Sequence, residues 1–408
     1  MARTRLLLLV ACSLLTAPGR GQEPVGGEVG RQLEALRKKN EELEERLEAI
    51  ESAPSSDQAG NGLQAHYGDI TASFKVFGDV GLEYRNPEEA GNAHTNFFLG
   101  SVDFFANVQM GDHFRILSET VLEARGTETV FADQERLWAM WTFSDSLYFK
   151  LGTEHSPISR WNQLYHHGRW LETSISRPLL AAFEGDGGIL PMHETGLEMG
   201  GRLQSGAGGF EWFTAVSNGR GLEPNNKQRT ADRNDSKKID AGLAFLPNAV
   251  PDLRFGTAFT YDEIPPDPTS VVAGRGLSIR EFLATAHAQY RSGPFEMLGE
   301  FAWIEHDARE LSSTFHHNAG YMQVALRAGE LTPYARMDYR DMERNDPFYL
   351  GRNRDLDIVR PVAGVRYDPS ATLAAKLEVT YGQEEQRGAG GVVDRDVLTL
   401  ALQVSWVL

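Results

Sequence analysis

Cysteine, long apolar runs and positive charge are all scarce in this sequence of 408 residues. No stretch approaches the roughly 20 apolar residues that a membrane-spanning helix needs, which argues against a helical membrane protein. Aspartate and glutamate (57) outnumber lysine and arginine (40), and the net charge of -17 argues against nucleic acid as a partner. A membrane β-barrel stays possible, because every second residue of its strands is polar.

The only cysteine, Cys12, lies in a segment that is typical of a secretory signal peptide. Residues 1–21 have a basic start, an apolar run over 6–15 and small residues over 16–21. The residues before Cys12 also resemble a lipoprotein signal, but the apolar run there is short. We therefore predict simple cleavage and a mature chain without cysteine, which excludes disulfides and thiol catalysis.

Helical periodicity is confined to residues 22–55, where apolar residues are spaced alternately four and three apart. This is the a/d seam of a coiled coil, formed by Val29, Leu33, Leu36, Asn40, Leu43, Leu47 and Ile50. The asparagine is at an a position, where a buried amide fixes register at a cost in stability. The alternative is a lone amphipathic helix, which is marginal at this length. We expect parallel self-association, followed by a linker over 56–67.

From residue 68 onward, apolar and polar residues alternate as they do in β-strands with two unlike faces. Short turns and longer polar loops follow each other in turn, which is the pattern of a transmembrane barrel. The longer loops are expected at 87–94, 126–133, 154–193, 219–236, 262–278, 307–314, 341–355 and 383–393. A soluble β-sandwich could also place charge on one face, but nothing else in the chain could cover so much outward apolar area. We predict an all-β fold, an antiparallel barrel of about sixteen strands over residues 68–408.

The predicted outward face consists of the apolar members of each alternating strand. Lipid-facing positions are expected to include Val76, Val80, Leu82, Val102, Phe104, Leu377, Val379, Leu400 and Leu402. Aromatic residues near the predicted strand ends fit the girdles at the two membrane interfaces: Tyr84, Phe98, Phe143, Trp303, Tyr339, Tyr381 and Trp406.

Several stretches resemble the bacterial outer-membrane porins, in particular the phosphate-selective-porin-like barrels and the subset with an N-terminal periplasmic coiled coil. They are FKVFGDVGLEYR, LTPYARMDY, GVRYDPSATLAAKLEVTYG and the terminal strand VLTLALQVSWVL. The resemblance implies a homotrimer in outer-membrane lipid, with a water-filled channel for passive diffusion of small hydrophilic solutes. We expect neither enzymatic activity nor a cofactor. Members of this group usually end on an aromatic residue, whereas this chain ends on Leu408.

The longest expected loop, 154–193, is the third on the outer side, and in the resembling porins this loop folds into the lumen and narrows it. Its first half is rich in basic and aromatic residues, and the expected constriction residues are Arg160, Trp161, His166, His167, Arg169, Trp170 and Arg177. Arginine forks suit carboxylate and phosphate, and aromatic faces suit stacking. These residues predict a modest preference for anions. The alternative is that they only hold the loop in place.

Histidines in this loop also raise the question of a metal site. His166 and His167, with His193 and Glu194, could in principle supply ligands. Adjacent histidines are not a ligand spacing by themselves and no cysteine supports them, so we predict no metal site.

Two other functions remain open at this point. The barrel could be structural and tether the membrane to the cell wall through its coiled coil. It could also be a hydrolase of the outer membrane, for which Ser156 and Ser159 lie near histidines in the sequence.

Overall fold

The computed structural model describes residues 62–86, 94–125, 129–166, 168–224, 232, 235–267, 276, 278–308, 311–350, 356–388 and 391–408. The predicted signal peptide, the predicted coiled coil and most of the predicted linker lie outside these residues, as does His167. Among the described residues, no helix is both long and apolar enough to cross a membrane.

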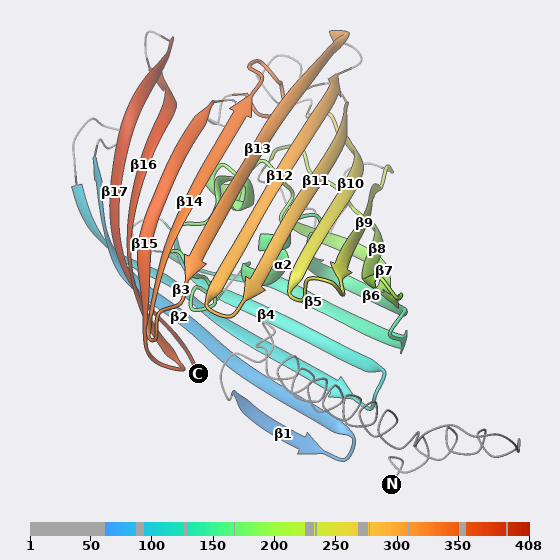
Figure 1. Cartoon of the computed structure of the whole chain (residues 1–408). Helices are drawn as coiled ribbons and strands as arrows, with labels where there is room; N and C mark the ends of the chain where they lie inside the picture. Colours follow the sequence, from blue (N-terminus) through green and yellow to red (C-terminus); the bar gives the residue numbers. More distant parts are fainter. Residues whose placement is uncertain are drawn as a thin grey trace, which may run out of the picture. The chain divides into compact units, whose positions relative to one another are not determined.

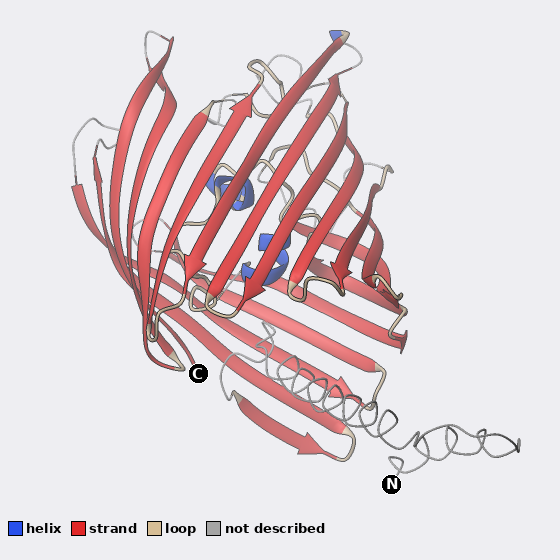
Figure 2. Ribbon diagram, viewed as in Figure 1, coloured by secondary structure: helices blue, strands red, loops and turns tan. Residues whose placement is uncertain are grey.

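A single antiparallel sheet closes on itself to form a barrel (Figures 1 and 2). The sheet has 17 strands; β1 is a short addition paired with β2, and the remaining strands, β2 to β17, form a closed barrel of sixteen because β17 pairs with β2. The strands are β1 (Leu63–Tyr67), β2 (Ile70–Asn86), β3 (His94–Met110), β4 (Phe114–Arg125), β5 (Thr129–Ser144), β6 (Leu147–His155), β7 (His193–Gln204), β8 (Gly208–Ser217), β9 (Lys238–Pro247), β10 (Leu253–Ile264), β11 (Ile279–Ser292), β12 (Phe295–Ala308), β13 (Ser313–Leu326), β14 (Leu331–Met342), β15 (Ile358–Ser370), β16 (Leu373–Gly388) and β17 (Gly391–Val407). The prediction of about sixteen antiparallel strands is confirmed.

The seam between β17 and β2 shows how the barrel closes. Trp406 is opposite Gly78, and a Cβ at that glycine would lie 2.4 Å from the indole ring, so the glycine makes room for the aromatic ring. Beyond Trp406, Leu408 exchanges two backbone hydrogen bonds with Val76, at 2.9 and 3.0 Å. Strand β1 then continues along the same edge of β2, with Leu63 opposite Phe74. Residues 63–67 are therefore a strand, and the prediction that they belong to a linker is wrong.

The outward face of the barrel is apolar, as predicted. None of the nine expected lipid-facing residues is buried, and Leu377 (54%), Leu402 (46%) and Phe104 (45%) are among the most exposed of them. None of the seven predicted girdle aromatics is buried, and Phe143 is 58% exposed. Phe98 is nevertheless on the inward face, because it is opposite Gly81 while its neighbour Phe97 is opposite the outward Leu82, so its assignment to the girdle is wrong. The inward face carries charge instead, including Asp79 at 2% exposure. The alternation in sequence therefore corresponds to the two faces of the barrel wall.

Several of the predicted long loops extend into strands, as at 262–264 and 307–308, and two do so more extensively. Strand β5 pairs with β4 back to Thr129, opposite Arg125, so residues 129–133 belong to the sheet and not to a loop. Strands β16 and β17 likewise pair out to Gly388 and Gly391, within the expected loop 383–393. The segment 383–393 is mostly polar, and in 129–133 the apolar residues Val130, Phe131 and Ala132 are consecutive, so neither shows the alternation that marks a strand in sequence. The backbone hydrogen bonds of a ladder do not require an apolar face.

Candidate functional site

The loop between β6 and β7, residues 156–192, lies inside the barrel (Figure 2). We call it the lumen loop. It contains the helix α2 (Arg160–Tyr165) and the two 3-10 turns η1 (Leu179–Ala181) and η2 (Glu184–Asp186). Its backbone bonds to side chains of strands β3, β12, β14 and β16. The prediction that the third outer loop folds inward is thus confirmed.

A carboxylate of the wall fixes the start of the lumen loop. Glu300 of β12 accepts hydrogen bonds of 2.6 Å from the backbone N–H groups of Arg160 and Trp161, and another of 2.6 Å from the Tyr321 hydroxyl. Ser159 caps α2, because its hydroxyl accepts the N–H of Asn162 at 3.3 Å. The first N–H groups of a helix have no partner within it, and they attract negative charge. Glu300 therefore holds the amino end of α2 against the wall.

Basic side chains of β14, β15 and β16 hold the middle of the loop. They donate to backbone carbonyls of the loop and are Arg336, Arg340, Arg360, Arg366 and Lys376. Arg336, for example, reaches the Ser176 carbonyl at 2.8 Å and also bonds Asp338 at 3.0 Å. These cations are therefore used to bind the loop and its neighbouring carboxylates.

Two wall carboxylates complete the attachment of the loop. Glu378 of β16 accepts the backbone N–H groups of Ile175 and Ser176 at 2.9 and 3.0 Å. Asp103 of β3 accepts the N–H of Gly168 at 2.6 Å. Hydrogen bonds to charged groups contribute roughly 1.5–3 kcal/mol each, so these contacts together hold the loop firmly across the lumen.

Three of the predicted constriction residues are buried and hold the loop together. Trp161 is 0% exposed and packs edge-on against Tyr321, so the prediction that its ring offers a stacking face is wrong. The reason is that α2 turns this side of the helix toward the wall. Arg177 is 8% exposed; it donates to the Ala181 carbonyl at 2.8 Å and lies over the ring of Phe183. His166 is 3% exposed.

The other described members of the predicted set are partly exposed. Arg169 pairs with Glu172 at 3.0 Å, and the guanidinium of Arg366 lies over the Trp170 ring at 5.3 Å. Arg160 differs from both, because its guanidinium donates to two neutral amides, Gln289 at 2.9 Å and Gln163 at 3.3 Å.

The electrostatic surroundings of Arg160 set it apart within the loop. Burial, together with the positive charge of Arg254, lowers the pKa of Arg160 to about 10, so the guanidinium still carries its charge at neutral pH. Burial also lowers the pKa of Arg177 to about 10. Among the described residues, no carboxylate lies within ion-pair distance of the Arg160 guanidinium. Arg160 is therefore the cation of the loop that is best suited to attract an anion.

An open space separates the lumen loop from the wall formed by β5 to β11. We call it the lumen cavity; it consists of two adjoining spaces of about 270 and 220 Å³ that share Tyr148, Pro157, Gln163 and Phe213. Its charged lining residues are Arg136, Asp145, Lys150, Glu154, Glu198, Arg202, Glu211 and Arg254. Basic and acidic groups are equal in number, and Lys150 lies between Glu154 (3.2 Å) and Glu198 (2.9 Å).

Only part of this lining could be predicted from the sequence. Lys150 and Arg254 occupy positions that the strand alternation assigns to inward faces, and both line the lumen cavity. Tyr148, Glu198 and Glu211 were not singled out. Alternation along the strands predicts that these side chains face inward. It does not predict which side of the barrel the lumen loop leaves open, because that depends on which wall residues bind the loop.

The serines behind the hydrolase alternative are both buried. The Ser159 hydroxyl donates to Glu300 at 3.4 Å, and the Ser156 hydroxyl accepts from Lys238 at 3.4 Å. A serine nucleophile needs a base such as histidine within hydrogen-bond reach. In the part of the chain that the structure describes, neither serine is hydrogen-bonded to a histidine.

Comparison with known proteins gives no match by sequence and clear matches by structure. No protein-family model matches the chain, and no curated protein shows significant similarity to it. Solved barrels do match it at low identity, so the fold alone is shown.

Three of these structures illustrate the likeness. The anion-selective porin from Comamonas acidovorans has 12% identity and a TM-score of 0.58, over 83% of this chain and 100% of that one. OmpF of Salmonella typhi, in complex with daunomycin, has 9% identity and a TM-score of 0.56, over 85% and 100%. OmpT of Vibrio cholerae, an outer membrane protein in a trimer form, has 10% identity and a TM-score of 0.53, over 83% and 99%. The chain thus has a porin-like barrel of sixteen strands.

Proposed function

We propose that this protein is a bacterial outer-membrane porin, a water-filled channel for passive diffusion of small hydrophilic solutes. The observation that carries the proposal is the lumen loop, which is held across a closed barrel and leaves a charged cavity beside the wall. The exposed apolar outer face suits lipid, and the polar interior suits water. Structural likeness to proteins described as porins supports the same conclusion.

The channel is proposed to prefer small anions that carry carboxylate or phosphate, and only modestly. Arg160 supports this, because its guanidinium is bound only to neutral amides, one of which, Gln163, lines the lumen cavity. Charges at a constriction act in reduced dielectric, and arginines there favour anions. The balanced lining of the lumen cavity limits the effect. One structural neighbour is described as anion-selective.

Phosphate specificity is a weaker proposal than general anion preference. A phosphate-selective channel of the resembling kind needs a row of available basic residues. The basic side chains of β14 to β16 that could form one donate to carbonyls of the lumen loop, as Arg366 does to Glu172 at 2.9 Å. Their hydrogen-bonding capacity is therefore partly occupied.

The proposed assembly is a homotrimer with the coiled coil of residues 22–55 in the periplasm. Two arguments support it: the heptad seam in the sequence, which indicates self-association, and the trimer form of one structural neighbour. The coil by itself does not decide between two and three chains.

Planar-bilayer recording tests the function. Detergent-purified protein should insert as discrete steps of ohmic current, and a KCl gradient should give a reversal potential of the sign that favours chloride. Absence of any conductance from folded, membrane-inserted protein would overturn the channel and favour a structural barrel. A reversal potential that favours potassium would overturn the anion preference alone.

A further inference from the structure

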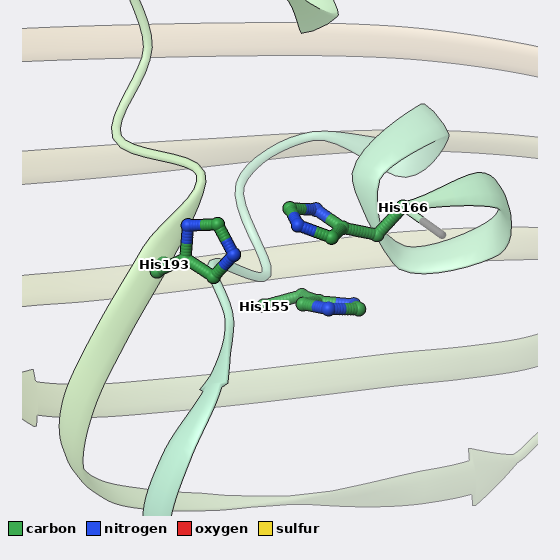
Figure 3. Close-up of side chains that lie close together, drawn as sticks. All are labelled: His155, His166 and His193. Atoms are coloured by element: carbon green, nitrogen blue, oxygen red, sulfur yellow. The ribbon is translucent and has the colours of Figure 1, made fainter. Parts of the chain in front are cut away.

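Three buried histidines come together where the lumen loop leaves and rejoins the wall (Figure 3). His155 ends β6, His193 begins β7 opposite it in the ladder, and His166 directly follows α2. The ring of His166 is stacked on that of His155, with centroids 3.7 Å apart, and lies edge-on to His193 at 4.4 Å. One ring nitrogen from each of the three lies within 4.8 Å of the others.

A carboxylate from a neighbouring strand joins the three imidazoles. Glu135 of β5, 3% exposed, brings Oε2 against Nε2 of His193 and to 3.7 Å from Nε2 of His166. Three imidazoles and one carboxylate make four donors, the number and kind that tetrahedral zinc uses.

The other ring nitrogens of two of these histidines are held by acceptors. Nδ1 of His166 contacts the Asn162 side-chain oxygen, and Nδ1 of His193 lies 3.3 Å from a Glu184 oxygen. Metal-binding histidines typically donate their second N–H in this way, which fixes the tautomer and leaves Nε2 for the ion. Glu184 is itself held in place, because it accepts the Met192 N–H at 2.8 Å.

A second buried group, His306, His317 and Asp346, provides a contrast. One oxygen of Asp346 binds both His306 Nδ1 and His317 Nε2 at 2.6 Å, and His306 Nε2 binds Glu281 at 2.9 Å. A single carboxylate oxygen thus bridges the two imidazoles of this second group. The first group also has carboxylate neighbours, with Glu135 and Glu184 at the two nitrogens of His193 and Glu119 at 3.5 Å from Nε2 of His155. It differs in that three imidazoles converge there instead of two.

We propose that His155, His166, His193 and Glu135 bind one divalent transition-metal ion, with Zn²⁺ as the first candidate. Imidazole donors suit zinc, copper and nickel, whereas calcium and magnesium require oxygen ligands. With Zn–N bonds of about 2.0–2.1 Å, the nitrogens of a tetrahedral site lie about 3.3 Å apart. The imidazoles therefore need to move inward slightly, which rotation of their side chains allows.

An ion at this position would join the lumen loop to the barrel wall. Its ligands come from β5, β6, β7 and the residue that follows α2, so it would fix both ends of the loop and its helix. The binding of the ion does not depend on the proposed channel function. Only the proposed effect of the bound metal on the channel current rests on that function.

The binding test uses the full-length protein in detergent, treated with chelator and titrated with ZnCl₂ by calorimetry, with metal content measured after gel filtration. Wild type is expected to bind one zinc per chain. The double variant His166→Gln/His193→Gln should bind zinc at least about tenfold more weakly, since loss even of a group that only supports a metal ligand typically has an effect of this size. His316→Gln, an exposed histidine outside both groups (51% side-chain exposure), should match wild type. So should His317→Gln in the second group.

Several results would overturn the proposal. The first is that wild type retains no zinc after gel filtration. The second is that the double variant binds zinc with the same affinity as wild type. A third is loss of binding in His317→Gln, which would move the site to the second group. Circular dichroism and the shift in gel migration on heating show whether the zinc-free variants are folded. Glu135→Gln is a milder variant that keeps all three imidazoles and is expected to weaken zinc binding.

Conductance measurements address the loop separately. Zinc should lower the current noise of wild-type channels and leave the double variant unchanged. If zinc binds but the current of wild type does not respond, the coupling of the ion to the loop is wrong and the binding site stands. If the protein binds zinc but never conducts, the proposed channel function fails on its own.

Discussion

Glu300 accepts a hydrogen bond of 2.6 Å from the backbone N–H of Trp161, a residue 139 positions earlier in the chain. The same carboxylate receives the N–H of Arg160 and the hydroxyl of Tyr321, also at 2.6 Å. A single buried side chain of the wall thus sets where the helix of the lumen loop begins. The width of the lumen at this level is therefore determined by a contact between distant parts of the sequence.

Replacement of Glu300 by alanine should loosen the lumen loop. It leaves two backbone N–H groups and the hydroxyls of Tyr321 and Ser159 without their acceptor, at about 1–3 kcal/mol for each buried group. Single-channel recording should show larger current noise than wild type. The matched control is Glu296→Ala, on the same strand but exposed at its side chain (37%), which should behave as wild type. Equal noise in both variants would contradict the anchoring role.

Arg160→Gln should reduce or abolish the preference for chloride. The substitution removes a charge that is bound to neutral amides, and keeps a hydrogen-bonding side chain of similar length. Because the pKa of Arg160 is about 10, this residue stays charged between pH 6 and 8, and its contribution to the wild-type reversal potential should be constant over that range. Arg177→Gln is the comparison: its side chain is buried against the Ala181 carbonyl, so stability should fall while the sign of the reversal potential is kept.

Asp346→Asn should destabilise the barrel at neutral pH and much less in acid. Burial alone would raise the pKa of Asp346, but the charge of His306 and hydrogen bonds from His306 and His317 hold the pKa well below its usual range. A carboxylate with a lowered pKa in the folded state stabilises it above about pH 4 and loses this contribution as pH falls further.

Unfolding in guanidinium at pH 7 and pH 3 provides the measurement for Asp346→Asn. The free energies of unfolding of wild type and variant should differ by about 1–3 kcal/mol at pH 7, and the difference should be smaller at pH 3, where the unfolded chain binds the proton more tightly than the folded one. A difference that stays constant with pH would show that Asp346 does not act through its charge.

Leu402→Arg tests which face of the barrel contacts lipid. Leu402 is 46% exposed on the outward face, and an arginine near the bilayer midplane costs about 2–4 kcal/mol of folding free energy. Leu331→Arg, at the first residue of β14 beside a short turn, should cost about 0–1 kcal/mol, as expected near an interface. Unfolding in liposomes compares the two. Similar small costs would mean that this face is not immersed in lipid.

The coiled-coil prediction concerns residues outside those that the structure describes. Polar substitution of Leu36 and Leu43 together should weaken the oligomer, because both lie in the apolar seam. Native mass measurement in detergent is the test. An unchanged oligomer would remove the coil from the assembly, and the barrel would then have to associate through its own walls.

The sequence was sufficient to predict the wall of the barrel but not its contents. Alternation has a period of two residues, so a residue such as Leu402 can be assigned to a face without any knowledge of its neighbours. The lumen loop has no such period. Its partners Glu300 and Glu378 are separated from it by more than a hundred residues, and only closure of the sheet brings them together.

Dependence on tertiary contacts also explains why the cluster of His155, His166 and His193 was not predicted from the sequence. His155 ends one strand, His193 begins the next, and their pairing in the ladder depends on the register of β6 with β7. From sequence, His166 and His167 with His193 and Glu194 were considered as ligands, and the prediction was no metal site. In the structure Glu194 pairs with Lys238 at 2.8 Å instead. Glu135 could not be anticipated, since its inward orientation next to these rings follows from the tertiary arrangement.

The attachment of the lumen loop also determines the order in which the protein can mature. The loop is made early in the chain, but its holders Arg336, Arg366, Lys376 and Glu378 belong to β14, β15 and β16, near the carboxyl end. Strands that precede β14 hold only the two sides of the loop, through Glu300 with the Trp161 N–H and Asp103 with the Gly168 N–H. The stretch around residues 172–177 therefore gains its attachments to the wall only when β14 to β16 are in place. A barrel truncated before β14 would lack these bonds and would hold the middle of its loop less firmly than the finished one.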